Sequence, residues 1–442
     1  MKEVFVTDLI NNGSLNTEVQ LQGWIKNRRH HGKLVFLDVC DSTGIIQVVI
    51  NRETIDEDSF NLAKKANLET SVNIRGTLIN GSGKSQLDRE IVVHEFNIIG
   101  EAESISPAIR ADDIDISNPG NADHLLKNRH LYIRNPQIIA VMIFRHRIMH
   151  FIREWFVKNR YIEITAPVLT MLPLYSDGSV LPVDIKGEKA YLTQCVGFYL
   201  EASVHALERV YNMGPSFRGE ESRSLRHLME YWHIKGEAAF ADLEDAIHTV
   251  ESIFSETVEF CERECQDIFA TLGTEIHTEG KLIPFPRISY REAGEMLKAA
   301  GLPFEFGTSL STTDEEFLAA QFDRPFWVVG IPRKIEPFPY VIDPDDPEIT
   351  RTADLIASRG FGELLGVAEK ISNLESLDER LREKGKAGDE NHEWLRDIRK
   401  YGCVPHIGFG MGVERLLRWL LDIRHVRDTM PFPRIFRRRI YP

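Results

Sequence analysis

Five short runs in which apolar and polar residues alternate stand near the start of the chain. β-Branched and aromatic residues dominate these runs, and such residues favour strands. Turn signals separate the first three runs, at His31-Gly32 and at residues 42–44. The runs are VQLQGWIKNRR (19–29), KLVFLDVCD (33–41), GIIQVVIN (44–51), TSVNIRGTLIN (70–80) and REIVVHEFNIIG (89–100). This spacing predicts a small unit built from five strands.

One helical pattern interrupts these strands. The segment DEDSFNLAKKAN, residues 56–67, follows the third run and has helical rather than alternating periodicity. Five strands with a helix after the third fit a small closed barrel of the oligonucleotide-binding (OB) type. We therefore predict an all-β barrel domain over residues 1–102.

The rest of the chain mixes helical and strand patterns without a regular repeat. Residues 103–130 are polar, contain Pro and Gly and have little periodicity, as expected of a linker. Long helical patterns follow at 136–159 and 239–272, and YIEITAPVLT (161–170) resembles a strand. The predicted fold class is α+β, in which the barrel is followed by a domain over 131–442 built on an antiparallel β-sheet with flanking helices.

Composition limits the classes of function. The chain is 43% apolar and 27% charged, which excludes a disordered or coiled-coil protein. Lys and Arg number 53 against 67 Asp and Glu, so a net charge of −14 gives no bulk basic footprint for nucleic acid, although a local one is compatible with it. The N-terminus lacks a signal pattern, and no apolar run approaches the ~18–20 residues that span a bilayer. We predict a cytoplasmic protein without a membrane segment.

The five cysteines are too few for a disulfide framework. Cys261 and Cys265 are one helical turn apart, which is a spacing that metal ligands use. Because no second pair of Cys or His residues completes a zinc site with them, buried thiols are the better interpretation.

The segment 211–237, YNMGPSFRGEESRSLRHLMEYWHIKGE, concentrates arginine, histidine and glutamate between two strand-like ends. Guanidinium groups bind phosphate oxygens bidentately, and a loop carrying Arg and His could close over a polyphosphate. A solvated charge run is the plain alternative. Gly-Pro and the apolar flanks of Phe-Arg-Gly-Glu argue against it.

A second glycine-rich segment, GFGMGVER, spans residues 408–415. It lacks the strand–helix–strand frame and the downstream acid of a dinucleotide site. Gly408, Gly410 and Gly412 would let the backbone approach a flat ring, and Arg415 on the following helix could meet phosphate. From these residues alone, a packing turn explains the segment equally well.

Together these segments resemble class II aminoacyl-tRNA synthetases. FRGE…RHLMEY and GFGMGVERLL are similar to motifs 2 and 3 of that family, and FIREWFVKNRYIEITAPVLT, with Pro167, is similar to motif 1. The barrel segment GWIKNRRHHGKLVFLDVCDSTGIIQVVI narrows the resemblance to the aspartyl, asparaginyl and lysyl subclass. YWHIKGEAAFADLEDAI, GFGELLG and Glu201 resemble the asparaginyl branch. Motif 1 implies a homodimer with two-fold symmetry.

The resemblance implies ATP-dependent activation of an amino acid and transfer of the acyl group to tRNA. Positioning and charge neutralisation would then supply most of the rate. Arg218 and Arg415 would hold the α- and γ-phosphates as the catalytic pair, and Asp354 and Glu363 would hold Mg²⁺ against them. The ATP-binding set it implies is Arg218, Glu220, Arg226, His227, Leu228, Tyr231, Glu363, Gly412 and Arg415, in which Arg226 and His227 close on the phosphate tail and the Tyr231 ring stacks on adenine.

In the barrel, three positions match those that recognise the central anticodon uridine. The resemblance implies that Phe36 stacks on the base while Arg29 and Gln47 contact its edge and phosphate. For Phe36 the alternative is a core aromatic on an alternating strand.

The amino-acid pocket departs from the family pattern. The resemblance places Asp177, Gln194, Gly197, Glu201 and Lys370 around the substrate. Gly197 replaces the glutamine that helps hold the α-amino group, Asp177 replaces a glutamate, and Lys370 replaces an arginine whose planar fork an ammonium does not reproduce. Glu369 and Cys40 also stand where the family has Gln and Arg.

These changes leave three hypotheses. The chain is an asparaginyl-type synthetase with a rearranged pocket, or a paralogue that adenylates a different amino acid and passes it to ammonia or another amine. A non-enzymatic RNA-binding protein is the third. The barrel residues favour tRNA as acceptor and the altered pocket favours the paralogue, since lost polar contacts change specificity. The retained phosphate-binding arginines argue against the third.

Overall fold

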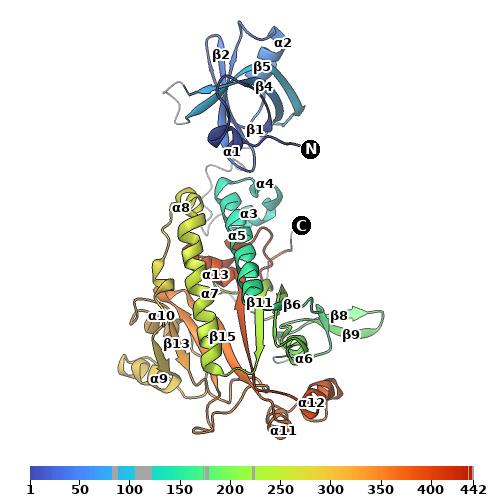
Figure 1. Ribbon diagram of the computed structural model, residues 1–442, viewed down its shortest axis with the longest axis vertical. Coiled ribbons are helices and arrows are strands. Elements are labelled where there is room, and N and C mark those ends of the chain that lie inside the picture. Colours follow the sequence, from blue (N-terminus) through green and yellow to red (C-terminus); the bar gives the residue numbers. More distant parts are fainter. Residues whose placement is uncertain are drawn as a thin grey trace. The chain divides into compact units, whose positions relative to one another are not determined.

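The computed structural model describes residues 1–81, 88–104, 122–172, 174, 179–221, 224–436 and 438–440. The chain divides into two compact units, Met1–Arg110 and Ala111–Pro442. Figure 1 shows the course of the chain through both.

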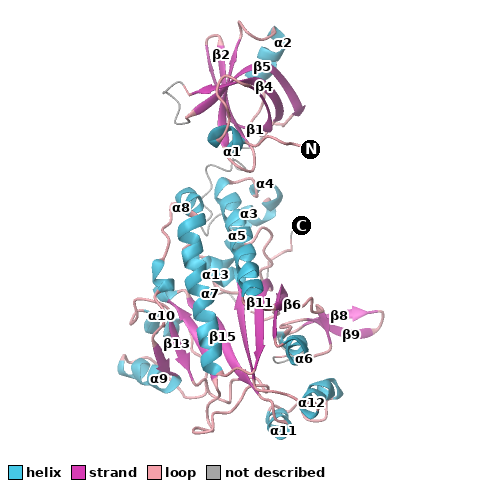
Figure 2. Cartoon of the chain, in the orientation of Figure 1, coloured by secondary structure: helices cyan, strands magenta, loops and turns pink. Residues whose placement is uncertain are grey.

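The first unit is a closed five-stranded barrel, as predicted (Figure 2). Its strands, in the spatial order β1-β2-β3-β5-β4, are β1 (Glu18–His31), β2 (Leu34–Cys40), β3 (Ile45–Asn51), β5 (Arg89–Gly100) and β4 (Ser71–Asn80). Helix α2 (Glu57–Lys65) follows the third strand, which confirms the predicted position of the helix. A short helix, α1 (Val6–Asn11), precedes the barrel.

Alternation along the strands builds the core of the barrel. In β2, Val35, Leu37 and Val39 are fully buried, while the residues between them keep partial exposure. Gly76 lies at a register shift between β4 and β5, where a Cβ atom would be 2.2 Å from the carbonyl oxygen of Val92. A glycine there lets the strands approach closely enough to close the barrel.

The second unit is built on an eight-stranded sheet in the order β12-β13-β14-β15-β16-β11-β10-β6. The inner pairs are antiparallel, as predicted, but both edge pairs are parallel. Parallel neighbours need a long connection, and helices stand in both of these connections. The strands are β6 (Ile162–Glu163), β10 (Arg209–Phe217), β11 (Glu230–Ala239), β12 (Arg287–Ser289), β13 (Phe326–Val329), β14 (Thr352–Ala357), β15 (Gly362–Lys370) and β16 (His406–Gly412).

Two long helices, α5 (Pro136–Lys158) and α7 (Leu243–Glu264), lie side by side and pack with the sheet in the main hydrophobic core (Figure 1). Proline at the first position of α5 and the Asp242 capping box of α7 fix where they begin. The helix predicted over 239–272 is two helices, because Cys265 leaves helical geometry (φ −127°) between α7 and α8 (Gln266–Leu272).

The remaining elements are a second, smaller sheet, shorter helices and 3₁₀ turns. A small three-stranded sheet has the order β7-β9-β8. Its strands are β7 (Leu169–Thr170), β8 (Leu181–Ile185) and β9 (Glu188–Leu192), and the further helices are α3 (Ala122–Lys127), α4 (Arg129–Tyr132), α6 (Gly197–Leu207), α9 (Tyr290–Ala299), α10 (Thr312–Ala319), α11 (Leu374–Glu383), α12 (Glu393–Lys400) and α13 (Val413–Leu420), with 3₁₀ turns η5 (Thr278–Lys281), η6 (Ser358–Gly360), η7 (Glu390–His392) and η8 (Val426–Thr429).

Helix α3 and the start of α4 lie inside the range 103–130 that we expected to be a linker, while residues 105–121 lie outside the described part of the chain. The boundaries at 102 and 131 therefore stay a prediction. Among the described residues, every helix is too short or too polar to cross a lipid bilayer.

Candidate active site

A cavity of about 370 Å³ opens on the face of the sheet opposite helices α5 and α7. Strand β11 lines it with alternate residues, Tyr231, His233, Lys235 and Glu237. The residue between two of them, Ile234, points into the hydrophobic core. This is the two-residue alternation of a strand, and it turns one face of β11 into a polar wall.

The floor beside that wall is a glycine strip, Gly408, Gly410 and Gly412 of β16. A Cβ atom at Gly410 would lie 2.8 Å from Nε2 of His233 and 2.9 Å from Cε of Lys235. Glycine is therefore required for the neighbouring side chains to occupy this space. The strip lies within a strand, so the packing-turn interpretation of this segment is wrong.

At one end of the cavity, positively charged side chains converge. Arg218, Arg226 and Arg415 all line it, and so does His227. Nη1 of Arg415 lies 3.3 Å from a carboxylate oxygen of Glu363 and donates a hydrogen bond to the carbonyl oxygen of the same residue at 3.1 Å. Residues far apart in the sequence are thus brought to one place, as predicted from the motifs.

The ionisation of these groups reflects their crowding. Burial, and then the charges of Arg415 and Arg218, lower the pKa of His227 to about 4. Burial opposes the ionisation of Glu363, but Arg415 and Arg218 outweigh it and hold its pKa below the usual value. Near neutral pH the histidine is uncharged, and the guanidinium groups supply the positive charge that a polyphosphate needs.

Four carboxyl groups lie beside the arginines, Asp354 on β14, Glu363 on β15, Glu315 and Glu336. Burial, and then the charges of the other three, raise the pKa of Asp354 well above its usual value. A carboxyl that keeps a proton because of neighbouring carboxylates is in a position where a divalent cation could replace that proton. The donor set therefore fits a hard cation such as Mg²⁺.

Glu315 also holds Arg226 through an ion pair. Arg226 donates a second hydrogen bond to Oγ1 of Thr312 at 3.0 Å. Gly362, which has a φ of +79°, makes room for this pair, because a Cβ atom there would overlap the Arg226 guanidinium. No sequence pattern singles out Glu315, which comes from α10, a helix outside the three motifs.

The other predicted nucleotide-binding residues lie around the same end. Leu228 and Tyr231 line the cavity. Glu220 pairs with Arg218 at 3.6 Å and borders a small neighbouring cavity that Arg218 and His227 also line. Gly412 leaves its Cβ position 3.9 Å from the Tyr231 ring.

The opposite end of the cavity carries a buried ion network. Nζ of Lys370 lies 3.2 Å from Oε1 of Glu237 and 3.5 Å from Oε2 of Glu201. Glu201 in turn forms an ion pair with Arg399 of α12, whose guanidinium also donates to the carbonyl oxygen of Ile371 at 2.7 Å. Lys370 lines the cavity, and Glu201 contacts Lys370 without lining the cavity itself.

The two acids of this network differ in their ionisation. Burial raises the pKa of Glu237 to about 7 against the attraction of Lys370. For Glu201 the charges of Arg399 and Lys370 outweigh burial and hold its pKa at about 2. Glu201 is therefore a permanent anion that anchors Lys370, whereas Glu237 can change its charge near neutral pH.

Side chains of β11 occupy the space that a longer side chain at position 197 would fill. The Cβ position of Gly197 lies 3.5 Å from Nζ of Lys235 and 3.8 Å from Oε1 of Glu237. Lys235 also donates to Sγ of Cys195 at 2.8 Å. Side chains of β11 thus reach into the space above Gly197. Gln194 is buried and donates to Oγ of Ser179 at 2.6 Å, and Asp177 lies outside the described residues.

Sequence reasoning missed several residues of the cavity, above all His233, Lys235 and Glu237. The signal was present, because each stands two positions from the next on a strand that already contained Tyr231. Arg399 had no comparable signal, since it meets Glu201 only through the fold.

In the barrel, the three predicted positions form one group. Arg29 of β1 is the register partner of Phe36 of β2, and it donates to Oε1 of Gln47 at 2.9 Å. Phe36 is half-exposed and lies between the buried Val35 and Leu37, so it is not a core residue. Gln47 is only 3% exposed and donates to Glu90 at 3.0 Å. The buried Gln47 amide therefore holds the Arg29 guanidinium in place.

Comparison with known proteins assigns the family. Residues 121–435 match the model described as tRNA synthetases class II (D, K and N), and residues 19–99 match an OB-fold nucleic acid binding domain. The chain belongs to the class II tRNA synthetase family.

Within that family it is similar to asparagine–tRNA ligases. It is 37% identical to the enzymes of Pyrococcus abyssi and Desulforamulus reducens, over 96% and 97% of both chains respectively. Among solved structures, the asparaginyl-tRNA synthetase of Pyrococcus horikoshii complexed with asparaginyl-adenylate has a TM-score of 0.93 at 33% identity over 100% of both chains. The Entamoeba histolytica enzyme in complex with asparaginyl-adenylate has a TM-score of 0.85 at 28% identity, covering 97% of this chain and 98% of that one.

Proposed function

We propose that this protein is an asparagine–tRNA ligase, which activates asparagine with ATP to the adenylate and transfers the asparaginyl group to tRNA. One observation carries the proposal: Arg218, Arg415 and Glu363 converge at one end of a cavity whose other end holds Lys370 and Glu237. This separates a site for phosphates from a site for a small polar acid. Full-length similarity to asparagine–tRNA ligases supports the same conclusion.

In the activation step, a carboxylate oxygen of the amino acid attacks the α-phosphorus of ATP and pyrophosphate leaves. Arg218 would neutralise charge at the α-phosphate and Arg415 at the γ-phosphate. Arg226 and His227 would close on the pyrophosphate, with His227 donating from a neutral ring. Tyr231 would stack on adenine above Gly412. Little covalent chemistry falls to the protein, so orientation and charge supply the rate.

Asp354 and Glu363 would hold Mg²⁺, which would neutralise phosphate charge when bound. Their neighbours Glu315 and Glu336 add negative charge to the same place. Glu315 has a second role, because it positions Arg226.

At the amino-acid end, the Lys370 ammonium would donate to the side-chain amide oxygen of asparagine, and Glu237 would accept from the amide nitrogen. Aspartate has no such donor and would bring a carboxylate towards Glu237. The pair therefore favours the amide over the acid, because a site discriminates strongly against a substrate that leaves its buried polar groups without partners.

For tRNA, we propose that Phe36 stacks on an anticodon base while Arg29 contacts its edge or phosphate. Gln47 would act by holding Arg29 in place, because its amide is buried and bonded on both sides.

We also propose a cytoplasmic homodimer. In the segment that resembles motif 1, Val157 and Ile162 expose 68% and 46% of their surface. Exposed apolar residues on a helix end and an edge strand are typical of a surface that another subunit covers. Light scattering of the purified protein should give twice the mass of the 50.7 kDa chain.

ATP–pyrophosphate exchange across the twenty standard amino acids tests the main proposal. Exchange should depend on asparagine, and charging should follow with an asparagine tRNA transcript but not with an aspartate one. Exchange with a different amino acid, or adenylate formation followed by transfer to ammonia rather than tRNA, would contradict it.

A further inference from the structure

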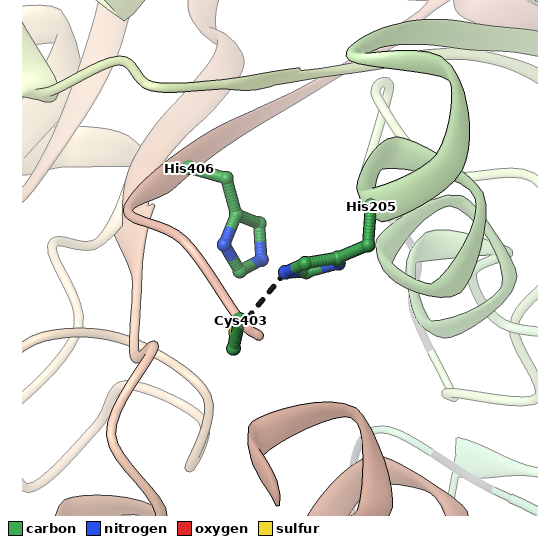
Figure 3. A group of neighbouring side chains, drawn as sticks. All are labelled: His205, Cys403 and His406. Atoms are coloured by element: carbon green, nitrogen blue, oxygen red, sulfur yellow. Dashed lines mark hydrogen bonds between the residues drawn. The ribbon is translucent and has the colours of Figure 1, made fainter. Parts of the chain in front are cut away.

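Three metal-ligating side chains meet outside the cavity (Figure 3). His205 belongs to α6, His406 begins β16, and Cys403 lies in the segment before β16. One ligand atom of each lies within 4.8 Å of the other two. The rings of His205 and His406 meet edge to face, with centroids 5.0 Å apart.

Backbone carbonyl groups fix both histidine rings in the same way. Nδ1 of His205 lies 2.7 Å from the carbonyl oxygen of Glu201, and Nδ1 of His406 lies 2.8 Å from that of Val404. A carbonyl oxygen only accepts, so each Nδ1 carries the proton. In this tautomer Nε2 is the nitrogen of each ring that offers a lone pair. This is the hydrogen bonding that orients histidines as metal ligands.

The Nε2 atom of His406 has no hydrogen-bond partner among the described residues, although the side chain is fully buried. It lies 4.0 Å from Oε1 of Glu201. Nε2 of His205 lies 3.1 Å from Sγ of Cys403 and 3.4 Å from the Val404 amide. A buried acceptor left without a donor points to a ligand that accepts its lone pair.

We propose that His205, Cys403 and His406 bind a zinc-like divalent cation. Two imidazoles and one thiolate are the ligand types that zinc prefers, whereas Mg²⁺ prefers oxygen. Two residues separate Cys403 from His406, a spacing that zinc sites use, and α6 supplies the third ligand. The Cys403 thiol loses its proton on binding. Because His205 and Cys403 are half-buried, water can complete the coordination.

The ion would tie α6 to the start of β16 and thereby support one wall of the cavity. Glu201 connects the two places, since its carbonyl oxygen holds His205 and its carboxylate pairs with Lys370 at 3.5 Å. This consequence, unlike the metal site itself, rests on the proposed function. Zinc removal should raise the KM for asparagine several-fold and leave the KM for ATP unchanged.

Cobalt titration of the full-length protein, untagged and stripped of metal, tests the site. One equivalent of Co²⁺ per chain should give thiolate-to-cobalt charge-transfer absorption, and Zn²⁺ should displace it and raise the thermal midpoint. His146 and His150 stack on α5 and could also bind Co²⁺, but without sulfur they cannot give this band.

Cys403→Ser and His205→Gln should each lose the band, whereas Cys40→Ala, in the barrel, should keep it. If Cys403→Ser does not fold, His205→Gln decides. No band in the wild type, or a band that persists in His205→Gln, would overturn the proposal. Neither result bears on asparagine-dependent exchange, so the two proposals can fail separately.

Discussion

Lys370 and Glu237 form a buried ion pair, 3.2 Å between Nζ and Oε1, at the end of the cavity remote from the arginines. The same ammonium lies 3.5 Å from Glu201. One ammonium group is therefore shared by two buried acids, of which Glu201 also pairs with Arg399. Its removal would leave both acids buried without their shared partner.

Lys370→Met should accordingly destabilise the protein by about 3–5 kcal/mol and abolish asparagine-dependent exchange, because a broken buried ion pair leaves uncompensated charge. Urea unfolding followed by tryptophan fluorescence measures the first effect. Lys400→Met, which removes a surface lysine paired with Asp397 on α12, is the control and should cost less than about 1 kcal/mol. Equal losses of unfolding free energy in the two variants would show that the buried ion network does not depend on Lys370.

Glu237 should make stability depend on pH. Burial raises its pKa from 4.5 to about 7, so the folded protein binds this proton more tightly than the unfolded chain does. Its contribution to stability is therefore lost as pH rises from about 4.5 to about 7, by up to about 1.4 kcal/mol per pH unit. Glu237→Gln should flatten the pH dependence of the urea midpoint in this window. An unchanged slope would contradict the assignment.

Arg218→Ala should reduce asparagine-dependent exchange by about 10²–10³-fold, since one donor aimed at developing charge is worth that much. Folding should be unaffected, because its side chain lines an open cavity. Arg263→Ala, at an exposed arginine on α7, is the matched control and should keep full exchange. Exchange at the wild-type rate in Arg218→Ala would show that this arginine does not bind the α-phosphate.

Phe36→Ala should weaken charging of tRNA and leave exchange intact. Loss of one base–aromatic stack costs about 1–3 kcal/mol, which corresponds to an increase of about 5–150-fold in the KM for tRNA. Trp24→Ala removes another exposed aromatic side chain of the barrel and should change neither assay. A parallel loss of exchange in Phe36→Ala would refute an anticodon role.

Much of the fold follows from local patterns. Val35, Leu37 and Val39 alternate with partly exposed residues, and this alternation predicted the barrel strand that contains them. The break at Cys265 could not be predicted in the same way, because apolar periodicity continues across it from α7 into α8. The parallel sheet edges also depend on how distant connections pass over the sheet.

The site was predictable where its residues stand in motifs and not where the fold alone unites them. Arg218 and Arg415 were both found, one in each of two motifs that meet at the cavity. Arg399 belongs to no motif, yet it determines the charge of Glu201. Cys403 and His406 have the sequence spacing of metal ligands, but this spacing indicates a site only when α6 brings His205 beside them.

The glycine strip of β16 limits how this pocket can be re-engineered for other substrates. Even a methyl group at Gly410 would collide with His233 and Lys235, so the middle of the floor offers no position for a new recognition group. Gly197 is different, because the atoms nearest its Cβ position belong to ends of side chains and lie 3.2 Å or more away. Libraries that seek altered amino-acid selectivity should therefore randomise Gly197 together with Lys235 and leave Gly410 untouched.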